Sequence, residues 1–309
     1  MKTILLSPVA LLLGLLGVCA GCSTEAGPSD PLSAPPPPKA GSDGERPATE
    51  PPEPPLPACA TNVVPLKLEY GLETVDTQLV PVRTATEEGW LTLDTGSALT
   101  FVYGKDDASR RYDVTIGCET LKVIRRDFAR SNHAGKPILG VLGADFLTTS
   151  LSELDYPGGR IVRHLDARSR PDATDGYAPA SILDARGHIA VRAEVDGTSR
   201  LLMVDTGSPN VLLVPAQGRP SDRRTTLQDV TGADVNGYVG DSNVTLGSET
   251  KRVPVWRIPS WPYFEGYQKE IHPELSGLFG LSALGFRRVV FDAKAGVMKL
   301  GPMQRLPTR

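Results

Sequence analysis

The sequence has little of several features that mark common protein classes. Its 309 residues include only four cysteines and 6% aromatic residues, and the formal net charge is −3. Four cysteines are too few for a small protein built on disulfides. A nearly balanced, slightly acidic charge argues against nucleic acid as the main partner. Hydrophobic residues still make up 40% of the chain, so a globular core is expected and wholesale disorder is excluded.

Several common catalytic motifs are also missing. The sequence has no Gly-x-Ser-x-Gly nucleophile elbow, no phosphate-binding Gly-Lys-Ser/Thr loop and no His-Glu-x-x-His pair. The histidines have no metal-ligand spacing, so we expect no metal site and no cofactor. We expect each of the four in a loop or at the surface: His133, His164, His188 and His272.

The N-terminal residues predict an export signal and a lipid anchor. Met1-Lys2 precedes an apolar run that is too short for a confident membrane-spanning helix. The run ends in Cys19-Ala20-Gly21-Cys22, which resembles a bacterial lipobox with Cys22 as the acylated residue. Residues 1–21 are therefore expected to be a lipoprotein signal peptide, and the alternative is an ordinary signal peptide. Because Ser23 rather than an acidic residue follows the cysteine, we expect an anchor in the outer membrane of a bacterial envelope.

A proline-rich segment follows the signal. Twelve of the 28 prolines lie between Ser23 and Pro57, where aromatic residues are absent and aliphatic residues are rare. Such a composition cannot bury enough apolar surface to offset the entropy of ordering, so residues 22–58 are predicted to be a disordered linker. An oxidising compartment would allow Cys59 and Cys118 to form a disulfide, but the sequence does not fix their geometry.

The rest of the chain contains an internal repeat. Three landmarks occur twice in the same order, which indicates a duplication. They are Leu91–Ser97 with Leu202–Ser208, Val114–Thr120 with Val244–Thr250, and Val141–Gly143 with Leu278–Gly280.

Short β-branched segments separated by glycine and proline predict an all-β fold for both copies. The second copy has 19 additional residues between its Asp-Thr-Gly-Ser sequence and Gly247. They include residues 231–240, whose glycines suit a β-hairpin. A further insertion in the second copy contains Trp261-Pro262-Tyr263-Phe264, which could line a substrate cleft or pack as an aromatic cluster under a loop.

Each copy ends an apolar strand with Asp-Thr-Gly-Ser. A single copy would be weak evidence, because this sequence also suits a turn. Two copies in a duplicated fold would be brought together by a pseudo-twofold axis, which would place Asp94 against Asp205. Two carboxyl groups about 3 Å apart cannot both ionise, so they share one proton. Such a pair can activate water for attack on an amide without a metal.

These motifs resemble those of aspartic peptidases of the retropepsin and pepsin type, fused here in one chain. The hydrophobic–hydrophobic–Gly elements match that family's second signature, and the resemblance extends over roughly Ala60 to Pro302. It implies a two-lobed all-β acid protease fold with the active site between the lobes. Residues 59–178 would be the first retropepsin-like lobe and residues 179–303 the second.

The resemblance also implies roles for individual residues. Asp94 and Asp205 would be the catalytic pair. Supporting roles would fall to threonines that brace the loops, to glycines that let backbone amides approach the carboxylates, and to serines that bond the outer carboxylate oxygens: Thr95, Thr206, Gly96, Gly207, Ser97 and Ser208. The family's flap usually lies in the first lobe, whereas the insertion here is in the second, so Tyr238 is the candidate flap tip and an exposed loop is the alternative.

The sequence therefore predicts a lipid-anchored aspartic endopeptidase of the bacterial envelope. Its substrate would be an extended polypeptide bound between the lobes. A chain that supplies both acids need not dimerise, so we expect a monomer. Two alternatives remain: an inactive module that binds peptides in the same cleft, and a structural lipoprotein in which both Asp-Thr-Gly-Ser sequences are only turns.

Overall fold

The structure is a computed structural model that describes residues 59–70, 75–105, 107–171, 174–229 and 233–306. The predicted signal peptide, the predicted lipidation residue Cys22 and the predicted linker lie outside these ranges. Among the described helices, none has the length and hydropathy needed to span a membrane.

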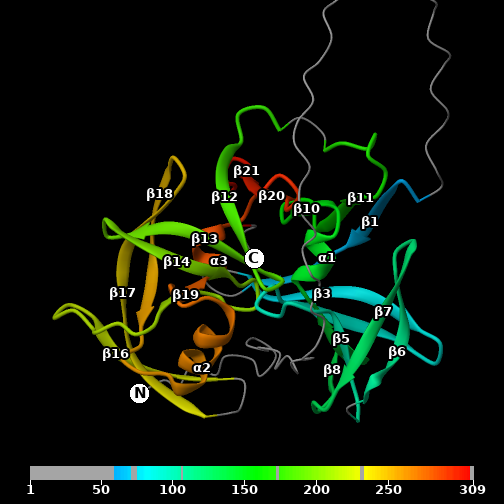
Figure 1. Cartoon of the computed structure of the whole chain (residues 1–309), viewed down its shortest axis with the longest axis horizontal. Helices are drawn as coiled ribbons and strands as arrows, with labels where there is room; N and C mark the ends of the chain where they lie inside the picture. Colours follow the sequence, from blue (N-terminus) through cyan, green and yellow to red (C-terminus); the bar gives the residue numbers. More distant parts are fainter. Residues whose placement is uncertain (1–58, 71–74, 106, 172–173, 230–232, 307–309) are drawn as a thin grey trace, which may run out of the picture. The chain divides into compact units, whose positions relative to one another are not determined.

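The first half of the described chain forms an eight-stranded sheet (Figure 1). Its strands are β2 (Lys67–Tyr70), β3 (Val75–Thr84), β4 (Glu88–Leu93), β5 (Phe101–Tyr103), β6 (Asp107–Ile116), β7 (Glu119–Arg126), β8 (Ser131–His133) and β9 (Lys136–Leu142). β9 lies between β4 and β5, parallel to the first and antiparallel to the second. β5 runs parallel to β7, β6 and β7 form a hairpin, and β3 also pairs with β6.

The second half repeats these pairings. Its strands are β13 (His188–Val195), β14 (Thr198–Val204), β15 (Val211–Leu213), β16 (Arg223–Gln228), β17 (Asp234–Leu246), β18 (Glu249–Arg257) and β19 (Leu275–Phe279). β19 lies between β14 and β15, parallel to the first and antiparallel to the second. β15 is parallel to β18, β17 and β18 form a hairpin, and β13 also pairs with β17. Both halves therefore place their Asp-Thr-Gly-Ser loop after an equivalent strand, β4 or β14.

Six further strands connect the two halves. They are β1 (Thr61–Pro65), β10 (Leu151–Asp155), β11 (Arg160–His164), β12 (Ala178–Ala185), β20 (Arg288–Asp292) and β21 (Val297–Leu300). Their order is β1-β11-β10-β20-β21-β12, so β10 of the first half pairs directly with β20 of the second. Leu154 and Val289 face each other in this pair, and both side chains are fully buried.

Three short helices accompany the strands in the described ranges. α1 (Ala144–Thr148) begins after Gly143, and α3 (Leu281–Leu284) begins after Gly280. These positions are equivalent in the repeat. α2 (Pro262–Ile271) lies between β18 and β19 and has no counterpart in the first half, where β8 occupies the corresponding part of the chain (Figure 1).

A shared core holds the two halves together. One cluster of buried side chains contains Leu93 and Leu142 of the first half together with Val204 and Phe279 of the second. Residues 59–306 belong to a single compact unit, so the proposed boundaries at 59–178 and 179–303 stay a prediction. The expected all-β class is confirmed.

A disulfide links Cys59 to Cys118 in the turn between β6 and β7. Asn62 supports the same turn, because its amide nitrogen donates to the Ile116 carbonyl at 2.9 Å and its carbonyl oxygen accepts from the Cys118 amide at 3.1 Å. Gly117, at the turn itself, has a φ of 60°, which favours glycine. The beginning of the described chain is thereby fixed to the first half.

Candidate active site

The two aspartates occupy equivalent positions at strand ends. The Asp94 amide donates to the Leu142 carbonyl at 3.0 Å, and the Asp205 amide donates to the Phe279 carbonyl at 3.1 Å. Each loop is therefore held against the end of the neighbouring parallel strand, β9 or β19. This arrangement follows from the two repeated landmarks, the Asp-Thr-Gly-Ser sequence and the hydrophobic–hydrophobic–Gly sequence.

Two threonines join the loops directly. The Thr95 amide donates to Thr206 Oγ1, and the Thr206 amide donates to Thr95 Oγ1, both at 3.0 Å. Thr95 Oγ1 donates in turn to the Val204 carbonyl at 2.8 Å, and Thr206 Oγ1 donates to the Leu93 carbonyl at 3.4 Å. Both threonines are buried. The loops of the two halves thus contact each other through reciprocal hydrogen bonds across 111 residues of sequence.

The glycine after each threonine lies against the carboxyl group of the other half. The Gly96 amide donates to its own loop's Asp94 Oδ1 at 2.9 Å, and the Gly207 amide donates to Asp205 Oδ1 at 2.8 Å. A Cβ atom at Gly96 would lie 2.8 Å from Asp205 Cγ, and one at Gly207 would lie 2.6 Å from Asp94 Cγ. Only a residue without a side chain leaves room for the two carboxyl groups to meet.

The carboxyl groups of Asp94 and Asp205 are hydrogen-bonded to each other. Each residue is only 1% exposed. Burial raises the pKa of Asp205 well above its ordinary value, and the charge of Asp94 and the hydrogen bond to it raise this pKa further. The amides of Gly207 and Ser208 act in the opposite direction. Because one ionised carboxylate disfavours ionisation of the other, the pair titrates as a unit and retains one proton over a wide pH range.

The prediction for the two serines is wrong. The Ser97 hydroxyl donates to the Leu99 carbonyl at 2.8 Å, and the Ser208 hydroxyl donates to the Asn210 carbonyl at 2.9 Å. Neither hydroxyl is directed to a carboxylate. A serine side chain readily donates to a carbonyl two residues away in a turn, so this local hydrogen bond forms instead of one to the more distant carboxylate. The serines close the loops, while backbone amides hold the carboxylates.

A tyrosine from α2 lies beside the acid pair. It belongs to the insertion that contains Trp261-Pro262-Tyr263-Phe264, but sequence reasoning did not single out this residue. The Tyr267 hydroxyl donates to the Gly96 carbonyl at 3.2 Å. Burial raises the pKa of Tyr267, and the charges of Asp205 and Asp94 raise it further, so the phenol is neutral and close to both acids. His188, the first residue of β13, contacts the same hydroxyl with Nε2 at 2.8 Å.

The expectation that each histidine lies in a loop or at the surface is wrong for His188 and His164, which are buried in β13 and β11. His188 is 2% exposed, and its imidazole meets the Tyr267 ring edge-on with the ring centroids 5.3 Å apart. His164 is 8% exposed and lies between Glu153 and Ser169, at 2.6 Å and 2.8 Å. Neither histidine belongs to a metal cluster, and no group of side chains in the described ranges has the arrangement of a metal site.

The prediction that Tyr238 is a flap tip is also wrong. The extra residues of the second copy do form a hairpin, β16 with β17, but its turn lies between Gln228 and Asp234. Tyr238 lies inside β17, paired with Arg224 on one side and Arg257 on the other. The turn itself includes residues 230–232, which lie outside the described ranges.

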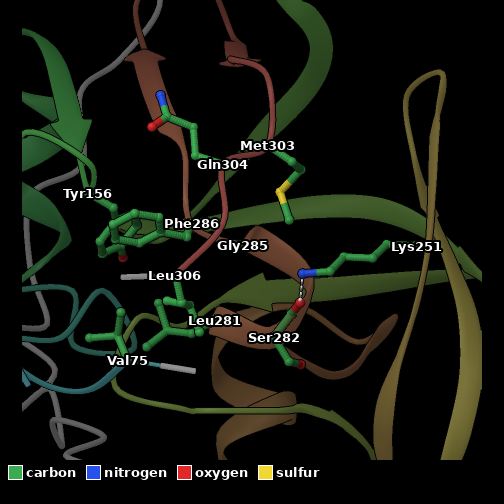
Figure 2. Close-up of a pocket in the computed structure, with 10 residues that line it drawn as sticks. All are labelled: Val75, Tyr156, Lys251, Leu281, Ser282, Gly285, Phe286, Met303, Gln304 and Leu306. Atoms are coloured by element: carbon green, nitrogen blue, oxygen red, sulfur yellow. Dashed lines mark hydrogen bonds between the residues drawn. The ribbon is translucent and has the colours of Figure 1, made fainter. Parts of the chain in front are cut away.

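A cavity of about 130 Å³ lies elsewhere in the molecule, between α3 and the C-terminal segment (Figure 2). Lys251 enters it from β18 and donates to the Ser282 carbonyl at 2.7 Å. Tyr156, Phe286 and Leu306 supply apolar walls. Neither Asp94 nor Asp205 is among its lining residues. The cavity is therefore distinct from the acid pair.

No family model and no curated protein matches this chain. Among solved structures, the chain is similar to an aspartic proteinase from Irpex lacteus, with a TM-score of 0.45 and 14% sequence identity over 79% of this chain and 98% of that chain.

Proposed function

We propose that this chain is an aspartic endopeptidase with a pepsin-like, two-lobed architecture and Asp94 and Asp205 as its catalytic pair. One observation carries the proposal: two buried carboxyl groups from equivalent loops are hydrogen-bonded to each other, and burial keeps a proton on the pair. Purely structural turns would have no need to bury two like charges against each other, since such burial is unfavourable.

The two acids have different roles in the proposed reaction. We assign the shared proton to Asp205, whose pKa is raised, and the base to Asp94. Asp94 takes a proton from water while the water oxygen bonds to the substrate carbonyl carbon, and Asp205 gives its proton to the carbonyl oxygen. The C–N bond of the resulting diol then breaks, with the proton on Asp94 moving to the nitrogen and Asp205 regaining a proton from a diol hydroxyl. The pair ends as it began.

The fold and the sequence support a proposal for the substrate class and for the location. An extended polypeptide, bound as an added strand between the halves, is the substrate that a pair of loops at a sheet interface can accept. The lipobox-like sequence at Cys22 supports a lipid anchor in the outer membrane of a bacterial envelope, with the proline-rich segment as a spacer.

A non-catalytic peptide-binding protein is the second candidate. The low exposure of both aspartates favours it, because a catalytic pair must be reached by water and by a peptide. The two candidates differ in their response to loss of one carboxylate. Replacing an acid by its amide removes the base or the shared proton, whereas it leaves the shape of a binding site nearly unchanged.

The test is cleavage of an unfolded, carboxymethylated polypeptide between pH 3 and 7, followed by mass spectrometry of the products. Wild type is expected to cleave it, and Asp94→Asn and Asp205→Asn are expected to lose at least roughly 100-fold in rate. Asp155→Asn is the matched control, because Asp155 is a buried carboxylate in β10 that bonds Gly158 and Arg160. Its activity should follow its folded fraction. A folded wild type that cleaves nothing would favour the binding protein.

A further inference from the structure

The acid pair is covered in this structure. Asp94 and Asp205 are each 1% exposed, yet the proposed reaction requires water and a peptide to reach their carboxyl groups. Some part of the chain above them must therefore move during turnover. The Tyr267 hydroxyl is the group from α2 that lies close to both acids, as its contact with the Gly96 carbonyl and its electrostatic coupling to Asp94 and Asp205 indicate.

The aromatic side chains of α2 cover the strands that carry the second acid loop. Phe264 is fully buried and Tyr267 is 8% exposed. Both belong to one cluster with Met203 of β14 and Leu278 of β19. Met203 is two residues before Asp205. The helix therefore packs on the surface directly beside the catalytic loop of the second half.

The contact of Tyr267 with Gly96 also joins the two halves. α2 belongs to the second half, and Gly96 belongs to the Asp-Thr-Gly-Ser loop of the first. The hydroxyl–carbonyl bond thus crosses the line between the halves, along which an extended substrate would lie. A peptide bound there would compete with Tyr267 for the Gly96 carbonyl, an acceptor beside Asp94.

The length and sequence of α2 are those of a segment that can open separately from the sheets. A ten-residue helix is marginal in isolation, so its stability comes from its buried aromatic side chains. Gly266 lies in the middle of the helix, where glycine lowers helix stability by about 1 kcal/mol relative to alanine. A Cβ atom at Gly266 would meet nothing within 4 Å, so no packing demands the glycine. Local opening is expected to require less free energy than unfolding of β14 or β19.

We propose that α2 is a lid over the acid pair, held closed by the Tyr267 hydroxyl on the Gly96 carbonyl, which opens to admit an extended polypeptide. The admission of substrate rests on the proposed function, whereas the opening of the helix does not. The lid is specific to the second half, since β8 occupies the corresponding part of the chain in the first half.

The test is hydrogen exchange of the α2 amides, followed by mass spectrometry at neutral pH. Tyr267→Phe removes the hydroxyl together with its bonds to the Gly96 carbonyl, the His188 ring and Met203 Sδ. It should raise the exchange of residues 262–271 at least about 5-fold, the effect of losing one net hydrogen bond of about 1 kcal/mol. Gly266→Ala should lower it by a similar factor. Tyr263→Phe is the matched control, because the charges that act on the Tyr263 phenol are Asp229 and Glu270 rather than the acid pair.

The outcomes separate the lid from the proposed function. The proposal would be overturned if the α2 amides exchanged as slowly as those of β14 and if Tyr267→Phe and Tyr263→Phe gave the same exchange. That result would show that α2 is a fixed part of the core. If cleavage occurs, its rate should follow the order of exchange, with Tyr267→Phe fastest and Gly266→Ala slowest, and the opposite order would also overturn it. Faster exchange in Tyr267→Phe without cleavage by any variant would contradict the peptidase and leave the movable helix supported.

Discussion

The Thr95 amide donates to Thr206 Oγ1, and the Thr206 amide donates to Thr95 Oγ1, both at 3.0 Å. This reciprocal pair is a direct polar link between the two halves at the candidate active site. It fixes the separation of the loops, and therefore that of the aspartates that precede the threonines. The hydroxyls, rather than the methyl groups, make the link.

Thr206→Val is expected to destabilise the protein by about 1–3 kcal/mol, because it leaves the buried Thr95 amide without its acceptor. The free energy of unfolding from urea titration measures this loss. Thr206→Ser retains the hydroxyl and should recover most of the stability and any cleavage activity. A larger loss in the serine variant than in the valine variant would show that packing of the methyl group, not the hydrogen bonds, holds the loops.

Gly207→Ala is expected to destabilise the protein by about 1–3 kcal/mol and to force the two acids apart, since the new Cβ would lie 2.6 Å from Asp94 Cγ. Thermal unfolding and cleavage activity measure the two effects. Gly266→Ala adds the same atom where nothing lies within 4 Å, so it should not destabilise the fold. A stable, active Gly207→Ala protein would contradict the close approach of the loops.

The raised pKa of Asp205 predicts how stability depends on pH. The folded state holds the proton more tightly than the unfolded state, so the contribution is present below the unfolded pKa near 3.8 and is lost as pH rises through the higher folded pKa. Asp205→Asn removes the buried charge and should flatten this decline. The comparison is the melting temperature of both proteins from pH 4 to pH 8. A variant that loses stability in parallel with wild type over this range would refute the assignment.

His188 predicts a pH dependence of opposite sign. Burial lowers its pKa from 6.5 to about 4, against the charge of Asp184 in β12 and the hydrogen bond to the Gly96 carbonyl, which raise it. The Tyr267 hydroxyl of α2 also contacts the His188 ring, and Gly96 itself lies against the Asp205 carboxyl group. On acidification, His188 therefore takes up a proton in the unfolded or opened state before it does so in the folded state. The free energy of unfolding falls as pH drops from 6.5 towards 4, by about 3 kcal/mol in all if the imidazole stays buried.

The measurement for His188 is the free energy of unfolding at pH 7 and at pH 4.5. His188→Gln should lose less stability between these values than wild type does. Exchange of the α2 amides should also rise on acidification in wild type, after correction for the intrinsic rate, and rise less in the variant. The same acid response in both proteins would show that another group is responsible.

The acid pair could be predicted from the sequence because the duplication repeats both the loop and the element that supports it. Asp94 and Asp205 each begin an identical Asp-Thr-Gly-Ser sequence at the end of an apolar strand, and a symmetric fold brings two such sequences together. The serines could not be assigned correctly, since their hydroxyls choose a carbonyl two residues away, a contact set by the loop conformation.

The contacts through which Tyr267 covers the acid pair could not be predicted from the sequence. Tyr267 reaches Gly96 across 171 residues, and it reaches His188 across 79. No repeated motif links these positions, because α2 occurs in one half only. The position of Tyr238 could not be predicted either. The glycines of residues 231–240 predict a hairpin but not its turn, which precedes Tyr238, and the strand continues through that residue.

The most direct test of the central claim is a titration of the carboxyl carbons of Asp94 and Asp205 by ¹³C NMR. A proton shared by the two groups should make both signals respond together in two steps, one of them well above the ordinary pKa of an aspartate. In Asp94→Asn, the upper step should move down, since the neighbouring charge is gone. Two independent titrations near the ordinary value in wild type would contradict a shared proton and, with it, the catalytic pair.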